Sequence, residues 1–145
     1  MKAGLIGEKL SHSLSPAIHS KFFRLTGIPG SYSLFETAKD SLGAFLERLA
    51  SEGYIGVNVT IPYKTEIIKY LDGLSDEAEA IGAVNTVLFK YGRKFGFNTD
   101  YYGLKALLRT EGISLKGARV LILGTGGAAR CAHKLARDMG AANVT

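Results

Sequence analysis

The chain has 145 residues, of which 46% are hydrophobic and 21% charged, so it can bury a core and we do not expect disorder. Its net charge of +5 comes from scattered Lys and Arg residues, which argues against a nucleic-acid-binding surface and favours a mild preference for small anions. No apolar stretch is long enough to span a membrane, and the start of the chain turns polar too early for a secretory signal. The single cysteine, Cys131, agrees with a reducing compartment, and we expect a cytoplasmic protein in which Cys131 is buried in a helix.

The first part of the chain predicts a strand followed by a helix. The apolar run Lys2 to Gly7 indicates a buried strand. Ser15 and Pro16 have the cap-then-proline order that opens a helix, and Gly27 is expected to end it. The apolar residues expected on one face of this helix are Ile18, Phe22 and Leu25.

The same alternation then repeats twice. Residues Ser31 to Glu36 predict a strand, and the next helix should stop at Gly53. Its apolar face is expected to contain Leu42, Phe45, Leu46 and Leu49. A third strand should run from Tyr54 to Thr60 until Pro62 breaks it, and a further helix should extend to Gly73. The apolar residues expected in that helix are Ile67, Ile68 and Leu71.

A hairpin closes this region. A short helix from Asp76 to Ile81 should precede strands from Val84 to Phe89 and from Lys94 to Asn98, joined by the turn Tyr91 to Arg93. Strands that alternate with helices predict an α/β fold, with a mainly parallel sheet flanked by helices and the hairpin as an antiparallel addition. We assign residues 1–100 to this first domain.

The remainder predicts the beginning of a Rossmann-type nucleotide-binding domain. A helix from Tyr101 and a linker ending at Gly117 should connect the domains over residues 101–117. Within residues 118–145, an apolar strand from Arg119 to Leu123 runs into a G-x-G-x-x-A loop and a helix. Such a loop can bring its backbone close to a pyrophosphate at the helix N-terminus, although a glycine-rich turn can also merely pack a helix onto a sheet. The predicted cofactor-binding residues are Gly124, Gly126, Gly127 and Ala128.

Together with the glycine loop, four short segments resemble the shikimate dehydrogenase family in order and spacing. They are Ser11–Pro16, Asn58–Lys64, Gly82–Thr86 and Asn98–Gly103. The resemblance implies a substrate-binding domain followed by the start of an NADP-binding domain. It implies the reversible, NADPH-dependent reduction of 3-dehydroshikimate to shikimate in aromatic amino acid biosynthesis.

The resemblance makes Lys64 and Asp100 the catalytic residues. A nearby carboxylate favours a protonated amine, so Lys64 could polarise a ketone oxygen and donate a proton while Asp100 orients it. Ordinary explanations also exist, because Lys64 could be a solvated charge and Asp100 could cap the helix from Tyr101.

The other substrate-binding residues that the resemblance implies offer hydroxyl and amide groups. Two serines at a helix start suit a carboxylate, although a serine before proline is also an ordinary cap. Asparagines in strands are unfavourable unless their side chains are satisfied, which favours ligand contact, with support of a backbone turn as the alternative. The full predicted substrate site is Ser13, Ser15, Asn58, Thr60, Lys64, Asn85 and Asp100.

Several residues receive a purely structural interpretation. The histidines at 12, 19 and 133 form no metal-binding pattern, so we expect no metal site. Arg130 could approach a cofactor phosphate or simply be exposed. The aromatic residues Phe22, Phe23, Tyr32 and Phe35 are expected in the core.

Two other functions fit the same sequence. One is a quinate or dual-specificity dehydrogenase that uses NAD, and the other is a non-catalytic module that binds a hydroxy acid or serves in assembly. The family's nucleotide domain continues beyond Thr145, so we expect the residues that select NAD or NADP outside this sequence and the chain alone to be inactive. We expect a small-molecule substrate, no nucleic-acid or membrane partner, and a monomer or homodimer.

Overall fold

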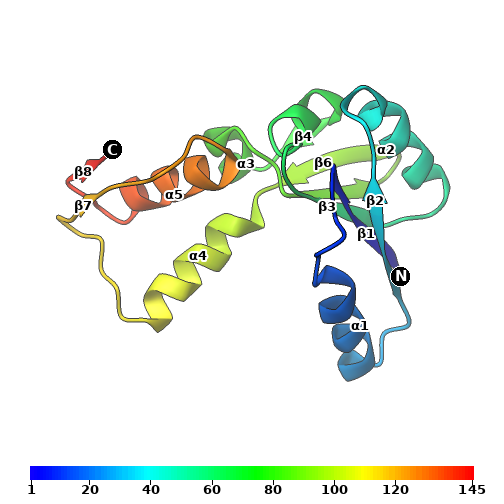
Figure 1. Ribbon diagram of the computed structural model, residues 1–145, viewed down its shortest axis with the longest axis horizontal. Helices are drawn as coiled ribbons and strands as arrows, with labels where there is room; N and C mark the ends of the chain where they lie inside the picture. The colour runs from blue at the N-terminus through cyan, green and yellow to red at the C-terminus, as the bar shows by residue number, and fades with distance from the viewer.

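The computed structural model describes residues 1–145 and contains one six-stranded sheet and one two-stranded sheet (Figure 1). The strands of the large sheet are β1 (Lys2–Gly7), β2 (Ser31–Glu36), β3 (Gly56–Val59), β4 (Gly73–Leu74), β5 (Thr86–Lys90) and β6 (Arg93–Phe97). They lie in the order β2-β1-β3-β5-β6-β4. β1 is parallel to β2 and β3, β5 is antiparallel to β3 and β6, and β4 is parallel to β6. Only β5 therefore runs against the others, which confirms a mainly parallel sheet with one hairpin.

Helices cover both faces of the sheet and form most of the C-terminal part. The α-helices are α1 (Ser15–Thr26), α2 (Leu42–Ser51), α3 (Asp76–Ile81), α4 (Thr99–Thr110) and α5 (Gly127–Asp138). The 3-10 helices are η1 (Lys39–Ser41) and η2 (Glu66–Tyr70), and the small sheet pairs β7 (Arg119–Val120) with β8 (Asn143–Val144). None of these helices has the length and apolar character needed to cross a membrane.

The main core lies between α2 and one face of the large sheet. Leu42, Leu46 and Leu49 recur at helical spacing and are fully buried, as their periodicity predicted. They pack against Ile6 and Val59, which are paired in register on β1 and β3 and point to the same face. Burial of each such side chain stabilises the fold by roughly 1.5–3 kcal/mol, so this layer holds the sheet in place.

Helix α1 lies on the opposite face of the sheet, and its expected apolar face is not buried. Ile18, Phe22 and Leu25 are 61%, 48% and 73% exposed, whereas Phe23 is buried. The prediction that Phe22 lies in the core was wrong, because helical periodicity shows which residues share a face but not what covers it. The helix also has Leu14 rather than Ser15 at its N-cap, while Gly27 ends it with a φ of 68°, as expected.

Three other elements are shorter than the sequence predicted, and the first is the strand expected from Tyr54 to Thr60, which is β3 (Gly56–Val59). The helix expected after Pro62 is the five-residue 3-10 helix η2, because the chain returns to extended backbone directly after it at Leu71. The strand expected from Arg119 to Leu123 is only the two-residue β7. Leu123 is 89% exposed, since β8 alone pairs with β7 and does so over two residues.

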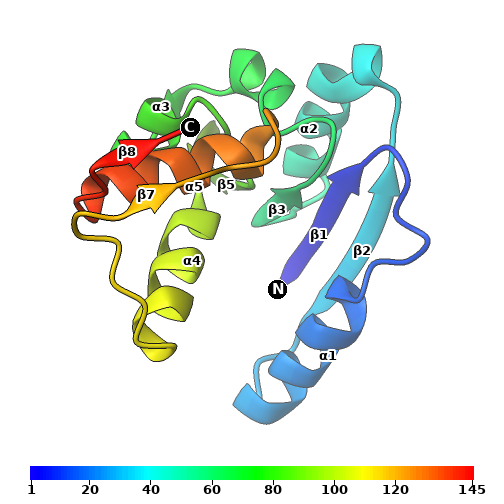
Figure 2. The same cartoon turned by 60° about the vertical axis from the view of Figure 1, so that its left-hand side comes forward.

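A second, smaller core connects α5, the helix that follows the glycine loop, to α3 and α4. α4, α5, β7 and β8 lie beside the large sheet, and α3 packs next to α5 (Figure 2). This cluster contains Ile81, Ala83, Tyr101, Cys131 and Leu135. The Tyr101 hydroxyl donates a hydrogen bond of 2.7 Å to Asp138, which joins α4 to α5. Cys131 is buried in α5, as predicted from its context.

Candidate active site

The predicted substrate-site residues meet at one edge of the large sheet. Strands β1, β3 and β6 end at this edge, and β5 begins there because it runs in the opposite direction. A cavity of about 600 Å³ opens at this edge, which is where open α/β sheets bind ligands. Its lining includes every predicted substrate-site residue, namely Ser13, Ser15, Asn58, Thr60, Lys64, Asn85 and Asp100. Lys9 and His12 also line it, although the sequence interpretation gave them no role.

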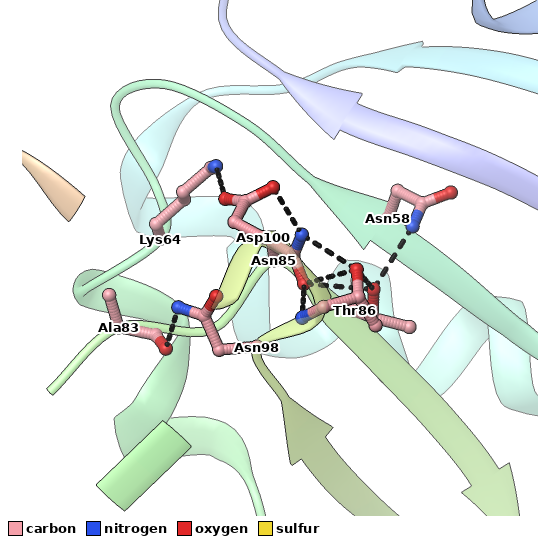
Figure 3. Close-up of polar contacts among 8 residues, drawn as sticks. Asn58, Lys64, Ala83, Asn85, Thr86, Asn98 and Asp100 are labelled. Atoms are coloured by element: carbon pink, nitrogen blue, oxygen red, sulfur yellow. Dashed lines mark hydrogen bonds and ion pairs between the residues drawn. The ribbon is translucent and has the colours of Figure 1, made fainter. Parts of the chain in front are cut away.

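An ion pair joins Lys64 and Asp100 inside this cavity. The Lys64 Nζ donates a hydrogen bond of 2.5 Å to Asp100 Oδ2, from the turn after β3 to the first turn of α4 (Figure 3). The alternative that Asp100 caps α4 is wrong, because Asn98 occupies the N-cap position and Asp100 lies inside the helix. The alternative that Lys64 is a solvated surface charge is also wrong, because its side chain is only 17% exposed.

Asn85 holds the second oxygen of the same carboxylate. Its Nδ2 donates a hydrogen bond of 2.8 Å to Asp100 Oδ1, and its Oδ1 accepts one of 2.8 Å from the backbone N–H of Thr99. The buried amide therefore supports the backbone at the start of α4 and faces the cavity at the same time. Because both Asp100 oxygens have partners, the carboxylate is held in one orientation.

Asn58 is bonded on both sides by side chains that the sequence interpretation did not assign to the site. Its Nδ2 donates to Thr86 Oγ1 at 3.1 Å, and its Oδ1 accepts from the Tyr32 hydroxyl at 2.7 Å. Support of a backbone turn, the alternative explanation for Asn58, is therefore not its role. Placing Tyr32 wholly in the core was wrong as well, since the ring is half-buried and its polar end reaches the site. Period-two alternation within each strand could not reveal this contact, because the register of β2, β1 and β3 places Tyr32 and Asn58 on one face of the sheet.

The two serines lie at the start of α1. Ser13 Oγ accepts a hydrogen bond of 3.3 Å from the backbone N–H of Ser15, and both side chains remain partly exposed to the cavity. The unpaired N–H groups and the partial positive charge of a helix N-terminus favour a carboxylate at this position.

Asn98, at the end of β6, is a buried polar residue that the sequence interpretation left out of the site. Its Nδ2 donates a hydrogen bond of 2.9 Å to the Ala83 carbonyl, while its Oδ1 is buried without a partner. The bond to Ala83 links the end of β6 to the segment before β5. It therefore fixes the two backbone segments that carry Asn85 and Asp100.

The glycine loop forms a second cavity that adjoins the first. This cavity of about 490 Å³ is lined by Gly124, Gly126, Gly127 and Ala128, the predicted cofactor residues, and by residues of the turn after β3. Gly124 has a φ of 132°, which favours glycine, and Gly126 is the N-cap of α5. Lys64 lines both cavities, so a ligand in either one can reach its side chain.

Arg130 is exposed on α5 and borders the glycine-loop cavity. No three His, Cys, Asp or Glu side chains gather closely enough to hold a metal ion.

The fold and the two adjoining cavities define an α/β protein with a polar cavity at the edge of its sheet, next to a glycine-rich loop that opens a helix. Residues 5–87 match the family described as the shikimate dehydrogenase substrate binding domain. The shikimate dehydrogenase (NADP(+)) of Clostridium perfringens (strain SM101 / Type A) is 48% identical over 141 residues, which cover 97% of this chain and 52% of that protein.

Solved structures agree with this match. Shikimate dehydrogenase 1 from Peptoclostridium difficile aligns with a TM-score of 0.94 and 43% identity, covering 99% of this chain and 53% of that one. The shikimate 5-dehydrogenase from Thermus thermophilus in complex with NADP(H) and shikimate aligns with a TM-score of 0.91 and 41% identity, covering 99% of this chain and 55% of that one. The chain belongs to the shikimate dehydrogenase family, and it spans about half the length of these relatives.

Proposed function

We propose that this chain supplies the substrate site and the start of the cofactor site of an NADP-dependent shikimate dehydrogenase, which reversibly reduces 3-dehydroshikimate to shikimate in aromatic amino acid biosynthesis. The observation that carries the proposal is the position of Lys64, which is paired with Asp100 and lines both the polar cavity and the glycine-loop cavity. A dehydrogenase needs such a proton donor between its substrate and its cofactor.

The residues present fit an NADP cofactor and a cyclic hydroxy acid. Gly124 with its positive φ, the glycine at the N-cap of α5 and the helix N-terminus suit a pyrophosphate, and NADPH would supply the hydride when bound. The Lys64 ammonium would polarise the ketone oxygen and donate a proton to it, and the neutral amine would take that proton back in the reverse direction. Asp100 would orient Lys64 and accept a hydrogen bond from a substrate hydroxyl.

The remaining polar groups would bind the rest of the substrate. Ser13 and Ser15 would hold its carboxylate at the N-terminus of α1. Asn58, Thr60 and Asn85 would bond its hydroxyl groups.

We further propose that the protein works in the cytoplasm as a monomer or homodimer, without a nucleic-acid or membrane partner. The scattered basic residues and the single buried thiol support this assignment. The proposed domain division is residues 1–100, a connection over 101–117 and the nucleotide-binding start at 118–145.

A steady-state assay of the full-length enzyme that contains this chain tests the function. Shikimate with NADP⁺ should give a higher kcat/KM than quinate with NAD⁺, and the opposite order would favour the quinate alternative. No dehydrogenase activity with either pair, together with tight shikimate binding by calorimetry, would favour a non-catalytic binding module instead.

A further inference from the structure

Tyr32 reaches the candidate site from the far side of β1. It lies on β2 opposite Ala3 of β1, and Ala3 in turn lies opposite Gly56 of β3. These two small residues leave room for the tyrosine ring to extend over β1, so that its hydroxyl bonds Asn58 Oδ1 at 2.7 Å. A small cavity of about 170 Å³, lined by Ala3, Tyr32 and Asn58 among others, follows this path along the sheet.

Helix α1 clamps the ring of Tyr32. The imidazole of His19 stacks on it, with ring centroids 3.8 Å apart and an interplanar angle of 14°. The His19 Nδ1 lies 2.9 Å from the carbonyl oxygen of Ser15, which fixes the imidazole to the first turn of α1. The tyrosine is therefore held between the element that carries the two serines and the strand that carries Asn58.

The hydroxyl of Tyr32 acts as a hydrogen-bond donor over the working pH range. Burial raises the pKa of Tyr32 to about 12, and the nearby Ser15 side chain only partly opposes this rise. A neutral phenol donates its proton, and Asn58 presents its carbonyl oxygen to receive it.

The hydrogen bonds from Tyr32 continue in one direction to Asp100. Asn58 donates to Thr86, the Thr86 hydroxyl donates to Asn85 Oδ1 at 3.0 Å, and Asn85 donates to the Asp100 carboxylate. For both Asn58 and Asn85, a neighbouring donor fixes the position of the amide oxygen and a neighbouring acceptor fixes the position of the amide nitrogen. For Asn58, one N–H and one lone pair remain for a ligand, and their placement depends on the bond from Tyr32.

We propose that Tyr32, clamped by His19, is a positioning residue that fixes the orientation of the Asn58 amide for hydrogen bonding to the hydroxyl groups of a bound cyclic polyol. This inference rests on the proposed function, because it assigns how one group of that site is held. Tyr32 does not line the substrate cavity itself and acts through Asn58.

The test is Tyr32→Phe in the full-length enzyme, which keeps the ring and the stack but removes the hydroxyl. KM for shikimate should rise about fivefold, as expected for the loss of one neutral hydrogen bond, while kcat changes by less than about twofold. The matched control is Tyr54→Phe, because Tyr54 packs edge-on against Phe35 on the opposite face of the sheet and its hydroxyl makes no hydrogen bond. This control should leave both constants unchanged.

A double-mutant cycle separates positioning from a general structural effect. In an Asn58→Ala background, Tyr32→Phe should cause no further rise in KM, because the residue that it positions is gone. An unchanged KM in the single variant, an equal rise in the Asn58→Ala background, or the same rise in Tyr54→Phe would overturn the inference.

A spectroscopic measurement keeps this inference distinct from the proposed function. The side-chain amide resonances of Asn58 in the full-length protein should shift, and their hydrogen exchange should accelerate, in Tyr32→Phe. Unchanged resonances would overturn the positioning role even if the wild-type enzyme oxidises shikimate. A wild-type enzyme without shikimate activity would defeat the proposed function alone, and the resonances would still decide whether Tyr32 holds Asn58.

Discussion

Gly127 of the glycine loop lies directly against the side chain of Lys64. A β-carbon placed at Gly127 would come within 3.2 Å of both Cβ and Cδ of Lys64 and within 3.3 Å of the Ala83 β-carbon. The absence of a side chain at this position therefore lets the start of α5 touch the residue that pairs with Asp100. The glycine loop and the polar cavity are parts of one packed arrangement.

Gly127→Ala should impair the full-length enzyme. The added methyl group must displace Lys64 or the loop, and overpacking of this kind costs roughly 1–3 kcal/mol. We expect kcat/KM for shikimate and NADP⁺ to fall by about tenfold. The matched control is Gly103→Ala in α4, where nothing lies within 4 Å of the added carbon. That change should raise the free energy of unfolding by about 0.5–1 kcal/mol without affecting activity, and equal activity losses in both variants would contradict the steric explanation.

Lys64→Ala should lower kcat of the full-length enzyme by about 10² to 10⁴, with a smaller change in KM, because the proton donor is lost. Steady-state rates with shikimate and NADP⁺ measure this effect. Lys39→Ala provides a control, since the Lys39 side chain is 63% exposed and its only ion pair is with Glu66, which also pairs with Lys69. A normal kcat in Lys64→Ala would refute the catalytic assignment.

Ser13→Ala should weaken substrate binding more than turnover. Its hydroxyl lies at the start of α1 and faces the cavity, where we place the substrate carboxylate. Loss of one hydrogen bond to a charged group costs about 1.5–3 kcal/mol, so KM for shikimate should rise at least tenfold. Ser51→Ala, at the exposed end of α2, serves as the control because Ser51 bonds only the Arg48 carbonyl. A fall in kcat at constant KM would speak against the carboxylate role.

The thiol of Cys131 should be unreactive in the folded protein. Its titration should also lower the free energy of unfolding at alkaline pH. Burial raises its pKa to about 11. Between the ordinary thiol pKa of about 8.5 and that value, the unfolded chain has lost the thiol proton while the folded chain retains it. The folded state therefore binds more protons, and the free energy of unfolding decreases as pH rises through this window.

Thiol labelling and denaturation measure this behaviour. At pH 8 a thiol reagent should react with Cys131 slowly in buffer and rapidly in denaturant. The pH-dependent loss of stability between about pH 9 and 11 should be smaller in Cys131→Ala. Rapid labelling of the folded protein would show that Cys131 is accessible.

Local sequence signals were sufficient for elements whose boundaries depend on the residues within them. The strand Ser31–Glu36 and the helix Asp76–Ile81 have the boundaries that were expected. The signals failed where a neighbouring element decides the outcome. Nothing in the spacing of Ile18, Phe22 and Leu25 shows that α1 meets the sheet through Phe23 and His19 instead. Likewise, the apolar residues after Val120 resemble a buried strand, but strand length depends on which strands pair with it.

The candidate site was predicted through motifs that belong to a known family, and its supporting residues were not. Lys64 and Asp100 come from distant segments, and only the resemblance suggested their pairing before the structure placed them 2.5 Å apart. Tyr32 and Thr86 carry no motif of their own that marks them as polar supports. Their role depends on the register of three strands, which a single sequence does not specify.

The reversed direction of β5 makes the geometry of the site sensitive to the length of one hairpin. Asn85 directly precedes the first strand of the hairpin, and Asp100 follows its second strand. The pairing of Thr86 with Phe97 therefore sets the distance between Asn85 and Asp100. Removing one residue from either strand would turn the later side chains of that strand to the opposite face, and would carry Asp100 away from Lys64. Changes in the length of this hairpin should therefore be tolerated only at the exposed turn of Tyr91 and Gly92, where the two strands can stay aligned.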